Sequence, residues 1–512
     1  MKAETATRDD PQTNGALWRA MVLVTLTFVT MLYVMAVTIA NVALPQMQGA
    51  LAATTDQIAW VVTFNIVATA IVTPMSGWLA SRFGRRRTML WSVVGFTISS
   101  ILCGTANSLT ELVIFRAFQG AFGAPLPPVS QAILLDTFPK YQHGTVISVW
   151  GMGVVLGPVI APTLGGYLSE IYSWRWVFYM MVPFGLASFA AVWVFILART
   201  SPRGVVRLDW TGFIALCFAV GCFQLMLDRG ERADWFQSTE IVLEGSIALI
   251  AFYIFIVHSM TAQTPFLSPQ FLRDRNFAIG LLITLIFGML NFVPMVLLPP
   301  LLQEIRGYPD LIIGYLLAFR GIGTLAGFTF NLFFANRIDP RLLMAVGFLC
   351  QGASGYFMAQ FDVNLTTFDV AWTSCLQGLG VGLIWVPLTM TTFATLAPRH
   401  VGDGSAVFHL VRNIGSSLFI SISIAVVIRT AKINYWSLAE NTSPFNEALR
   451  DQAVQGIWNL DTLTGLSALA GEVQRQALMI GYLNGFYMFA IAAIAVLPLL
   501  LLVRRPRDPA TP

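Results

Sequence analysis

The chain has 512 residues, of which 56% are hydrophobic and only 11% are charged. A soluble domain carries about 25% charged residues, so this composition excludes a water-exposed globular surface and predicts a lipid environment. The formal net charge of +4 is therefore no sign of a nucleic acid partner. The five cysteines lie in apolar stretches without paired ligand spacing, which argues against a zinc site or a disulfide framework.

Apolar stretches long enough to cross a membrane recur along the chain. A membrane-spanning helix needs about 20 mainly apolar residues, because every backbone polar group must be paired within the helix. The polar residues 1–17 precede the first such stretch and are expected to form a cytoplasmic tail, since a signal peptide would place its apolar core sooner. We predict an all-α membrane protein with fourteen transmembrane helices, at residues 18–42, 57–80, 88–106, 110–135, 146–169, 176–198, 211–228, 241–259, 277–302, 312–335, 341–361, 370–396, 404–430 and 481–503.

The placement of Lys and Arg predicts the orientation of these helices. With the N-terminus inside, basic residues favour the expected cytoplasmic loops and tails, for example at Arg86 and Arg203, whereas the opposite loops are short or acidic, with Glu304 and Asp310. This asymmetry follows the positive-inside rule. An even number of helices then places both termini in the cytoplasm, with residues 504–512 as the second tail.

One long extramembrane segment, residues 433–480, is expected on the periplasmic side between the last two helices. Apolar residues recur there at three- and four-residue spacing over 448–479, Leu463 and Leu466 among them. This spacing predicts an amphipathic helix. Two interpretations stay open: a helix that lies on the membrane or against a partner protein, and a short helical cap on the bundle itself.

Three residue clusters stand out: the first contains glycines and arginines, the second an arginine and a glutamine, and the third glycines and prolines. Around the loop after helix 57–80, glycines permit close approach and a tight turn, and arginines hold the loop on the cytoplasmic face. This cluster contains Gly77, Arg82, Gly84 and Arg85. The helix at 110–135 places Arg116 and Gln119 on one face. The helix at 146–169 has a pattern typical of kinked, closely packed helices, with Gly157, Pro158, Pro162, Gly165 and Gly166.

In this order and spacing, the three clusters resemble the signature motifs of the major facilitator superfamily, and the third resembles the motif of its antiporters. Segments 38–45, 174–178, 227–230 and 299–304 add further matches. Together they make nearly the whole chain similar to the EmrB/QacA group of 14-helix drug:proton antiporters, and closest to the EmrB-type multidrug export permease.

The resemblance implies the major facilitator fold, with an N-terminal six-helix bundle at 18–198, an inserted two-helix segment at 199–276 and a C-terminal six-helix bundle at 277–503. It implies a secondary active multidrug efflux transporter of the bacterial inner membrane that exports hydrophobic amphipathic compounds by alternating access. It also implies two protein partners, a periplasmic membrane-fusion adaptor and an outer-membrane channel. A single-component exporter, which needs no adaptor, is the alternative.

Departures from the family pattern affect the expected proton coupling. Ala36 occupies the place of the family acid in the first helix, and alanine cannot titrate, so coupling through that helix is in question. A facilitator or a transporter driven by another ion therefore stays open. Ser81 replaces the acid usual in the first cluster, and His409 stands where relatives carry Asn.

Three arginines, Arg116, Arg320 and Arg412, fall well inside predicted helices, where a charge should face a cavity or a partner. Each either fastens helices to one another or takes part in coupling and conformational change, and the match to the second motif favours the latter role for Arg116 and Gln119. His409 shares a helix face with Arg412 and titrates near neutral pH, so it is a hypothetical substitute for the missing acid; an interhelical hydrogen bond is the simpler interpretation.

Adaptable apolar side chains suit bulky amphipathic substrates, so we expect them to line the central cavity. The predicted cavity residues are Tyr33, Met35, Asn41, Phe64, Asn65, Phe292 and Trp385. The absence of an acid at Ala36 and the presence of the arginines favour neutral or anionic substrates. The four histidines form no ligand cluster, so we expect neither an enzyme nor a bound metal or cofactor.

Overall fold

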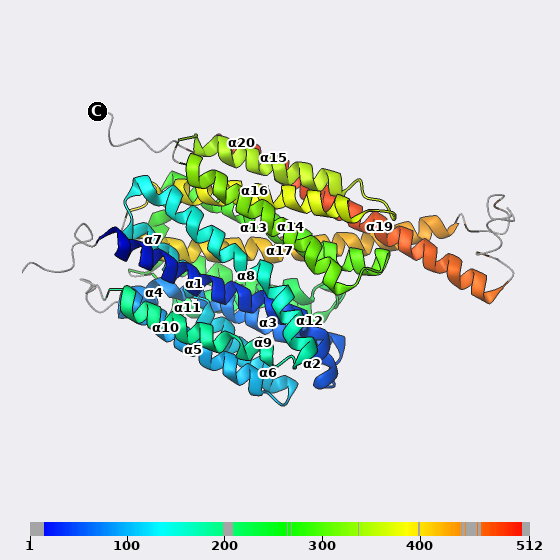
Figure 1. The fold of residues 1–512 in the computed structure, drawn as a ribbon, viewed down its shortest axis with the longest axis horizontal. Helices are drawn as coiled ribbons and strands as arrows, with labels where there is room; N and C mark the ends of the chain where they lie inside the picture. The colour runs from blue at the N-terminus through cyan, green and yellow to red at the C-terminus, as the bar shows by residue number, and fades with distance from the viewer. Residues whose placement is uncertain are drawn as a thin grey trace, which may run out of the picture.

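A computed structural model describes residues 15–197, 208–263, 265–267, 269–335, 337–397, 400–440, 442, 446, 458 and 462–503. Over these residues the chain forms α-helices and short 3-10 helices without β-strands, which confirms the predicted all-α class (Figure 1). The long helices lie side by side along one axis of the molecule, as bilayer-crossing helices must.

The N-terminal bundle contains two predicted transmembrane helices that are each built from two pieces. Its elements are α1 (Ala16–Val42), α2 (Leu44–Ala50), α3 (Thr55–Val72), α4 (Met75–Phe83), α5 (Arg85–Thr105), α6 (Leu109–Gly123), α7 (Leu126–Thr137), η1 (Lys140–Gln142), α8 (His143–Ile171), α9 (Trp176–Tyr179) and α10 (Met181–Phe195). The breaks between α3 and α4 and between α6 and α7 fall at Pro74 and Pro125, which lack the amide donor that a continuous helix needs. Across the first break the axis bends by 55°.

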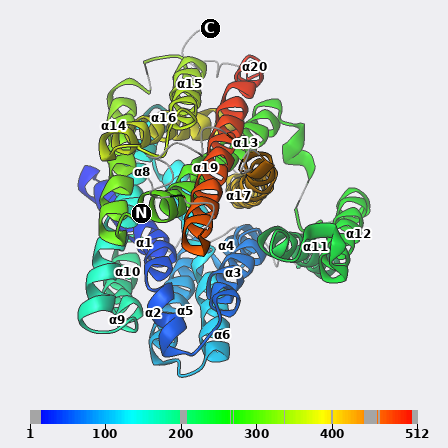
Figure 2. The same cartoon turned by 90° about the vertical axis from the view of Figure 1, so that its right-hand side faces the viewer.

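The remaining helices form the inserted pair and the C-terminal bundle. The inserted pair consists of α11 (Trp210–Arg229) and α12 (Thr239–Thr261). The C-terminal bundle consists of α13 (Arg275–Arg306), α14 (Asp310–Phe334), α15 (Pro340–Met358), α16 (Thr367–Phe393), α17 (Val401–Glu440), α19 (Leu463–Ala495) and α20 (Leu497–Leu500). Figure 2 shows the inserted pair standing to one side, where α11 packs against both α3 and α17. The inserted pair therefore contacts both bundles.

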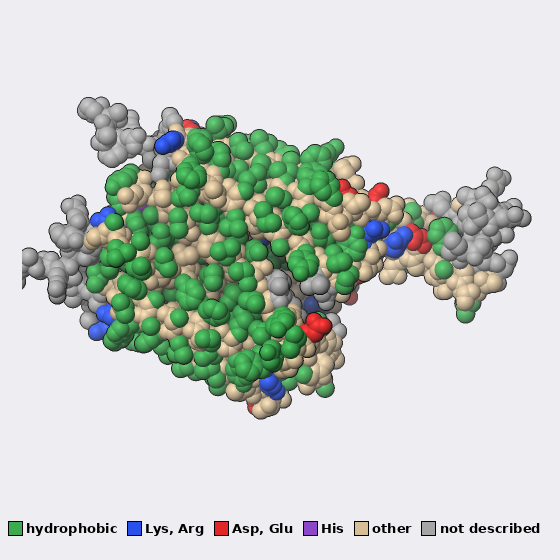
Figure 3. Space-filling model, viewed as in Figure 1, with side chains coloured by type: hydrophobic (Ala, Val, Ile, Leu, Met, Phe, Trp, Pro, Cys, Tyr) green, Lys and Arg blue, Asp and Glu red, His purple; other side chains and the backbone are tan. Residues whose placement is uncertain are grey.

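Eleven helices in the described part of the chain are long and apolar enough to cross a membrane, or twelve if the bent pair α3–α4 is one span. On the face drawn in Figure 3, apolar side chains cover the middle and charged ones gather at the two ends. The protein is thus a multi-pass membrane protein. The segments predicted at 110–135 and 341–361 are helical, as α6–α7 and α15, but fall outside that number, so the fourteen-helix count and the location of the termini stay predictions.

The segment expected between the last two helices is largely continuous with those helices. The predicted helix at 448–479 begins outside the described residues, and its second part belongs to α19, which runs unbroken into the bundle. The predicted helix is therefore confirmed over residues 463–479, where it continues into the last membrane helix, and its contact with the membrane, a partner protein or the bundle stays a prediction. The ends of α17 and α19 project beyond the bundle in Figure 1, and they carry exposed Ile433, Trp436 and Leu463.

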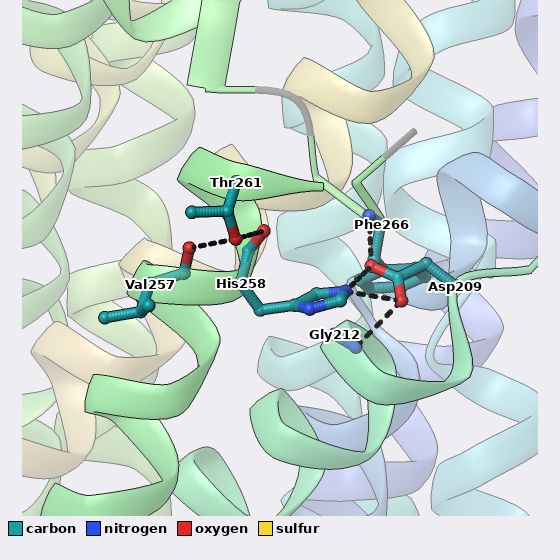
Figure 4. Close-up of polar contacts among 6 residues, drawn as sticks. All are labelled: Asp209, Gly212, Val257, His258, Thr261 and Phe266. Atoms are coloured by element: carbon teal, nitrogen blue, oxygen red, sulfur yellow. Dashed lines mark hydrogen bonds and ion pairs between the residues drawn. The ribbon is translucent and has the colours of Figure 1, made fainter. Parts of the chain in front are cut away.

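Asp209 precedes α11 and links the start of this helix to the end of α12 and to the loop that follows α12 (Figure 4). Its carboxylate accepts hydrogen bonds of 3.0 Å from the amides of Gly212 and Phe266 and lies 2.9 and 3.0 Å from Nε2 of His258. Burial raises the pKa of the Asp209 carboxyl. The hydrogen bonds from Gly212, His258 and Phe266 lower it by a larger amount, so the pKa lies below its usual value. This carboxylate therefore fastens α11, α12 and the following loop in its ionised form.

Candidate functional site

Arg116 fastens three helices of the N-terminal bundle. The side chain is only 1% exposed, its Nε donates to the carbonyl of Val61 at 3.3 Å, and its Nη1 donates to Oε1 of Gln119. Nε2 of Gln119 in turn donates to Oγ of Ser100 at 2.7 Å, and the guanidinium lies 5.8 Å from the ring centre of Phe178. The sequence placed Arg116 and Gln119 on one face, and the structure uses that face to join α3, α5 and α6.

The predicted site residues Asn65 and Tyr33 take part in the hydrogen bonds around the crossing of α3 and α6. Nδ2 of Asn65 donates to the carbonyl of Arg116 at 2.9 Å, and Oγ1 of Thr69 donates to the carbonyl of Gly120 at 3.2 Å. The hydroxyl of Tyr33 reaches Thr69 at 3.4 Å. A Cβ at Gly120 would lie 2.3 Å from the carbonyl oxygen of Asn65, so only glycine permits this approach.

Arg320 performs a similar task in the C-terminal bundle. Nε donates to Oε1 of Gln377 at 2.7 Å, and Nη2 donates at 2.8 Å to both the backbone and the side-chain oxygen of Asn291. These bonds join α14 to α16 and α13. These acceptors are neutral amide oxygens, so they leave the positive charge of the Arg320 guanidinium without a counter-ion.

Arg412 has fewer partners than the other two arginines. Nη2 donates to Oδ1 of its neighbour Asn413 at 3.0 Å, and the guanidinium carbon lies 5.5 Å from the ring centre of Trp385. Nε has no hydrogen-bond partner among the described residues. No ion pair in the described part of the chain joins a carboxylate to Arg116, Arg320 or Arg412.

His409 forms a hydrogen bond between the two bundles. The side chain is 2% exposed, and its Nε2 lies 2.9 Å from Oε1 of Gln131 on α7. Oγ of Ser405, one turn earlier on α17, donates to the same oxygen at 2.8 Å and lies 3.0 Å from the carbonyl of Pro128. The sequence predicted His409 but missed Gln131 and Ser405; an amide in an otherwise apolar helix is the signal that could have indicated Gln131. The ring of His409 contacts Trp385, as Arg412 does, so the two share a face as predicted.

Further contacts close the same end of the molecule, to which the predicted cytoplasmic loops belong. Gly77 on α4 packs so closely on α17 that an added Cβ would lie 2.4 Å from Oδ1 of Asp403. Nζ of Lys140 donates to the carbonyl of Ala394 at 3.1 Å. The bundles are therefore joined at this end by contacts of α4, α7 and η1 with α17 and the end of α16.

The rest of the first motif acts within the N-terminal bundle. Arg85 forms an ion pair with Asp136 at the end of α7. Gly84 has φ of +86°, a conformation that favours glycine and allows α4 to turn into α5. Arg82 is exposed, and the hydroxyl of Ser81 donates to the carbonyl of Trp78 at 2.8 Å.

Toward the opposite end the bundles make fewer contacts, since α17 packs against α4 and α7 but hardly touches α3. The third motif packs α8 on α1: an added Cβ at Gly157 would lie 2.9 Å from the carbonyl of Met31, and one at Gly165 would lie 2.6 Å from Ile39. By contrast, a Cβ at Gly166 on α8 or at Gly314 on α14 would meet nothing within 4 Å. The two helices do touch closer to the closed end, through Gly151 with Phe328 and Gly321 with Val159. Pro158 lies within continuous α8, and the side chain of Pro162 is outside the described residues.

The predicted cavity residues differ in burial. Met35, Asn65 and Trp385 are buried, Tyr33 and Phe292 are half-buried, and Phe64 is 39% exposed. The side chain of Asn41 is outside the described residues. The structure brings Trp385 together with Arg412 and His409, but it places Asn65 in a helix crossing. A substrate-contacting role for these residues stays a prediction.

Residues 26–420 match the family model described as Major Facilitator Superfamily. The chain is 32% identical to the Multidrug export protein EmrB of Haemophilus influenzae over 499 residues, which cover 97% of each chain, and 32% identical to that of Escherichia coli K12, over 94% of this chain and 95% of the relative. It is also 32% identical to the Fatty acid resistance protein FarB of Neisseria gonorrhoeae, over 97% of this chain and 98% of the relative.

Two solved structures have the same fold. The human organic anion transporter MFSD10 superposes with a TM-score of 0.61 at 13% identity, covering 93% of this chain and 99% of that chain. A double Trp mutant of XylE superposes with a TM-score of 0.64 at 11% identity, covering 96% of this chain and 97% of that chain.

Proposed function

Because the chain belongs to the Major Facilitator Superfamily, a family of transporters rather than enzymes, and is similar throughout to EmrB-type multidrug export proteins, we propose that it is a multidrug efflux transporter. Its substrates are hydrophobic amphipathic compounds, and it moves them across a bacterial inner membrane by alternating access. The transmembrane count is fourteen, with α6–α7 and α15 as the further spans and both termini in the cytoplasm.

The observation that carries this proposal is the unequal contact between the bundles at their two ends. Hydrogen bonds from His409 and Ser405 to Gln131, and the tight packing of Gly77 on Asp403, join the bundles at one end. At the other end Gly166 and Gly314 face no neighbour. This is the arrangement expected of an alternating-access transporter that is closed to the cytoplasm and open to the periplasm.

Proton coupling through the first helix is not part of the proposal, because Ala36 is buried and has no titratable group. His409 is the proposed coupling residue, since its ring takes part in the contact that must break when the cytoplasmic end opens. Proton binding at His409 would then be linked to the equilibrium between the two states. Undiminished proton-driven transport by a reconstituted His409→Asn variant would refute this role.

Proteoliposomes with an imposed pH gradient test the function and the coupling together. We expect the wild type to move an amphipathic dye in response to the gradient. If only an Ala36→Asp variant responds, the natural protein is no proton antiporter. Dye movement in neither protein, with or without a gradient, would contradict multidrug transport itself.

A periplasmic adaptor and an outer-membrane channel are the proposed partners. The arm formed by the ends of α17 and α19 supports the first of these, because it projects from the bundle and exposes large apolar side chains, with Trp436 71% exposed. Co-purification of the full chain with a periplasmic coiled-coil adaptor tests this assembly. Full drug export by the protein in a strain without such adaptors would favour the single-component alternative.

A further inference from the structure

The three interior arginines differ in how much of their hydrogen-bonding capacity is used. Arg116 is 1% exposed, donates to Val61 on α3 and to Gln119 on its own helix, and leaves Nη2 without a partner among the described residues. Arg320 makes three hydrogen bonds to amide and carbonyl oxygens of two other helices. Arg412 is half-buried, donates a single hydrogen bond to the adjacent Asn413 and leaves Nε unpartnered among the described residues. Arg116 and Arg320 are therefore each hydrogen-bonded to another helix, whereas Arg412 uses none of its donors to hold another helix among the described residues.

Arg412 lies one helical turn from the hydrogen bond between His409 and Gln131 that joins the two bundles. His409, one turn earlier on α17, makes the last hydrogen bond of this helix to α7. Beyond it, α17 runs toward the end where it makes few contacts with the opposite bundle. Tyr33 on α1 of the opposite bundle is within electrostatic range of Arg412 and is half-buried as well. A ligand held by Arg412 would thus lie between the two bundles.

The charge of Arg412 has no carboxylate counter-ion in the described part of the chain. The face of Trp385 offers a cation–π contact, which offsets only part of the cost of a guanidinium at membrane depth. A monoanionic ligand would neutralise this charge, whereas a dianion would leave a net negative charge in the same place. The planar guanidinium matches the two oxygens of a carboxylate.

We propose that Arg412, supported by Trp385, binds the carboxylate of an amphipathic organic monoanion, whose apolar body extends toward Tyr33 on the opposite bundle. The proposal rests on the export function above and specifies its substrate class. The anion brings its own counter-charge to α17, so a bound substrate also lowers the cost of enclosing Arg412 when the bundles change position.

Binding of a matched pair of fluorescent probes tests the proposal. Full-length protein in phosphatidylcholine nanodiscs is titrated at neutral pH with pyrenebutyrate, an anion, and with pyrenebutanol, its neutral counterpart, and the signal of empty nanodiscs is subtracted. We expect the wild type to bind pyrenebutyrate roughly tenfold or more tightly than pyrenebutanol, because a hydrogen-bonded ion pair contributes that much. Equal affinities would overturn the proposal without recourse to any variant.

An Arg412→Gln variant separates the charge from the packing. We expect it to lose at least tenfold in affinity for pyrenebutyrate and to keep its affinity for pyrenebutanol, and Arg412→Lys to recover part of the loss. Arg429→Gln is the matched control, since Arg429 is an exposed arginine on the same helix. An equal effect of Arg412→Gln and Arg429→Gln, or equal losses for both probes, would overturn the assignment.

Failure of the proposed anion site at Arg412 can be distinguished from failure of the proposed export function. If proteoliposomes do not transport pyrenebutanol or any other amphipathic dye, the export function fails, although selective binding of pyrenebutyrate would still locate an anion site. If the dyes are transported and Arg412→Gln leaves pyrenebutyrate transport unchanged, the export function stands and the site at Arg412 fails.

Discussion

Replacing Gln131 by Leu is expected to shift the protein away from the state seen in the structure. Oε1 of Gln131 is the acceptor shared by Ser405 and His409, and the side chain is fully buried between α7 and α17. Leucine preserves most of the volume but removes both hydrogen bonds. Ser405 keeps the carbonyl of Pro128, whereas the imidazole of His409 loses its only hydrogen bond among the described residues.

The size of the shift follows from these contacts. One lost hydrogen bond costs about 1 kcal/mol, and a buried polar group left without a partner adds about 1–3 kcal/mol. In the proposed state open to the cytoplasm, water would hydrogen-bond to His409, so the penalty would fall on the closed state alone. A net change of about 2 kcal/mol alters the equilibrium between the two states by roughly thirtyfold.

Distances between spin labels at positions 141 and 397 measure this equilibrium. Tyr141 and Ala397 are exposed and lie on opposite bundles at the closed end, near the contact of Lys140 with Ala394. We expect the short-distance population of the wild type to be largely replaced by a longer one in Gln131→Leu. Gln119→Leu is the control, because it removes a buried glutamine that bonds only within its own bundle. The reasoning is refuted if Gln131→Leu keeps the wild-type distance distribution.

Three further predictions concern stability, each measured as thermal unfolding of the purified protein. Arg320→Met should destabilise the C-terminal bundle by about 3 kcal/mol, because three hydrogen bonds vanish and their buried acceptors lose partners; a loss no greater than that of Arg412→Gln would contradict its role as a fastener. Gly120→Ala should cost about 1–3 kcal/mol, since the added Cβ clashes with the carbonyl of Asn65, while Gly166→Ala, which meets nothing, should cost no more than a few tenths. Because the pKa of Asp209 is lowered on folding, its contribution to the free energy of unfolding is present above the unfolded pKa of about 3.9 and is lost as pH falls through the folded pKa. Asp209→Asn should remove this part of the dependence of the melting temperature on pH. An unchanged pH dependence would exclude a stabilising role of the ionised carboxylate.

Much of the fold could be predicted because hydropathy is a local property of the sequence. Each apolar stretch must pair its own backbone groups in lipid, so each predicted segment is helical in the structure. The ordered motifs around Gly77, Arg116 and Gly157 indicated the family, which the comparisons confirm. The sequence did not reveal that α19 continues the last transmembrane helix outward, because an amphipathic extension and a separate surface helix have the same spacing.

The roles of the interior polar residues were decided by the tertiary structure alone. Arg116, Arg320 and Arg412 are each a charge within an apolar helix, and only Arg116 is further distinguished in the sequence, by its match to the second motif. Their partners come from positions far along the chain: Val61 for Arg116, Gln377 for Arg320, and the ring of Trp385 for Arg412. A single sequence determines which helices must form and which side chains are costly to bury. Which of those costs is offset by a neighbouring helix, and which is left for a ligand, depends on how the helices are brought together.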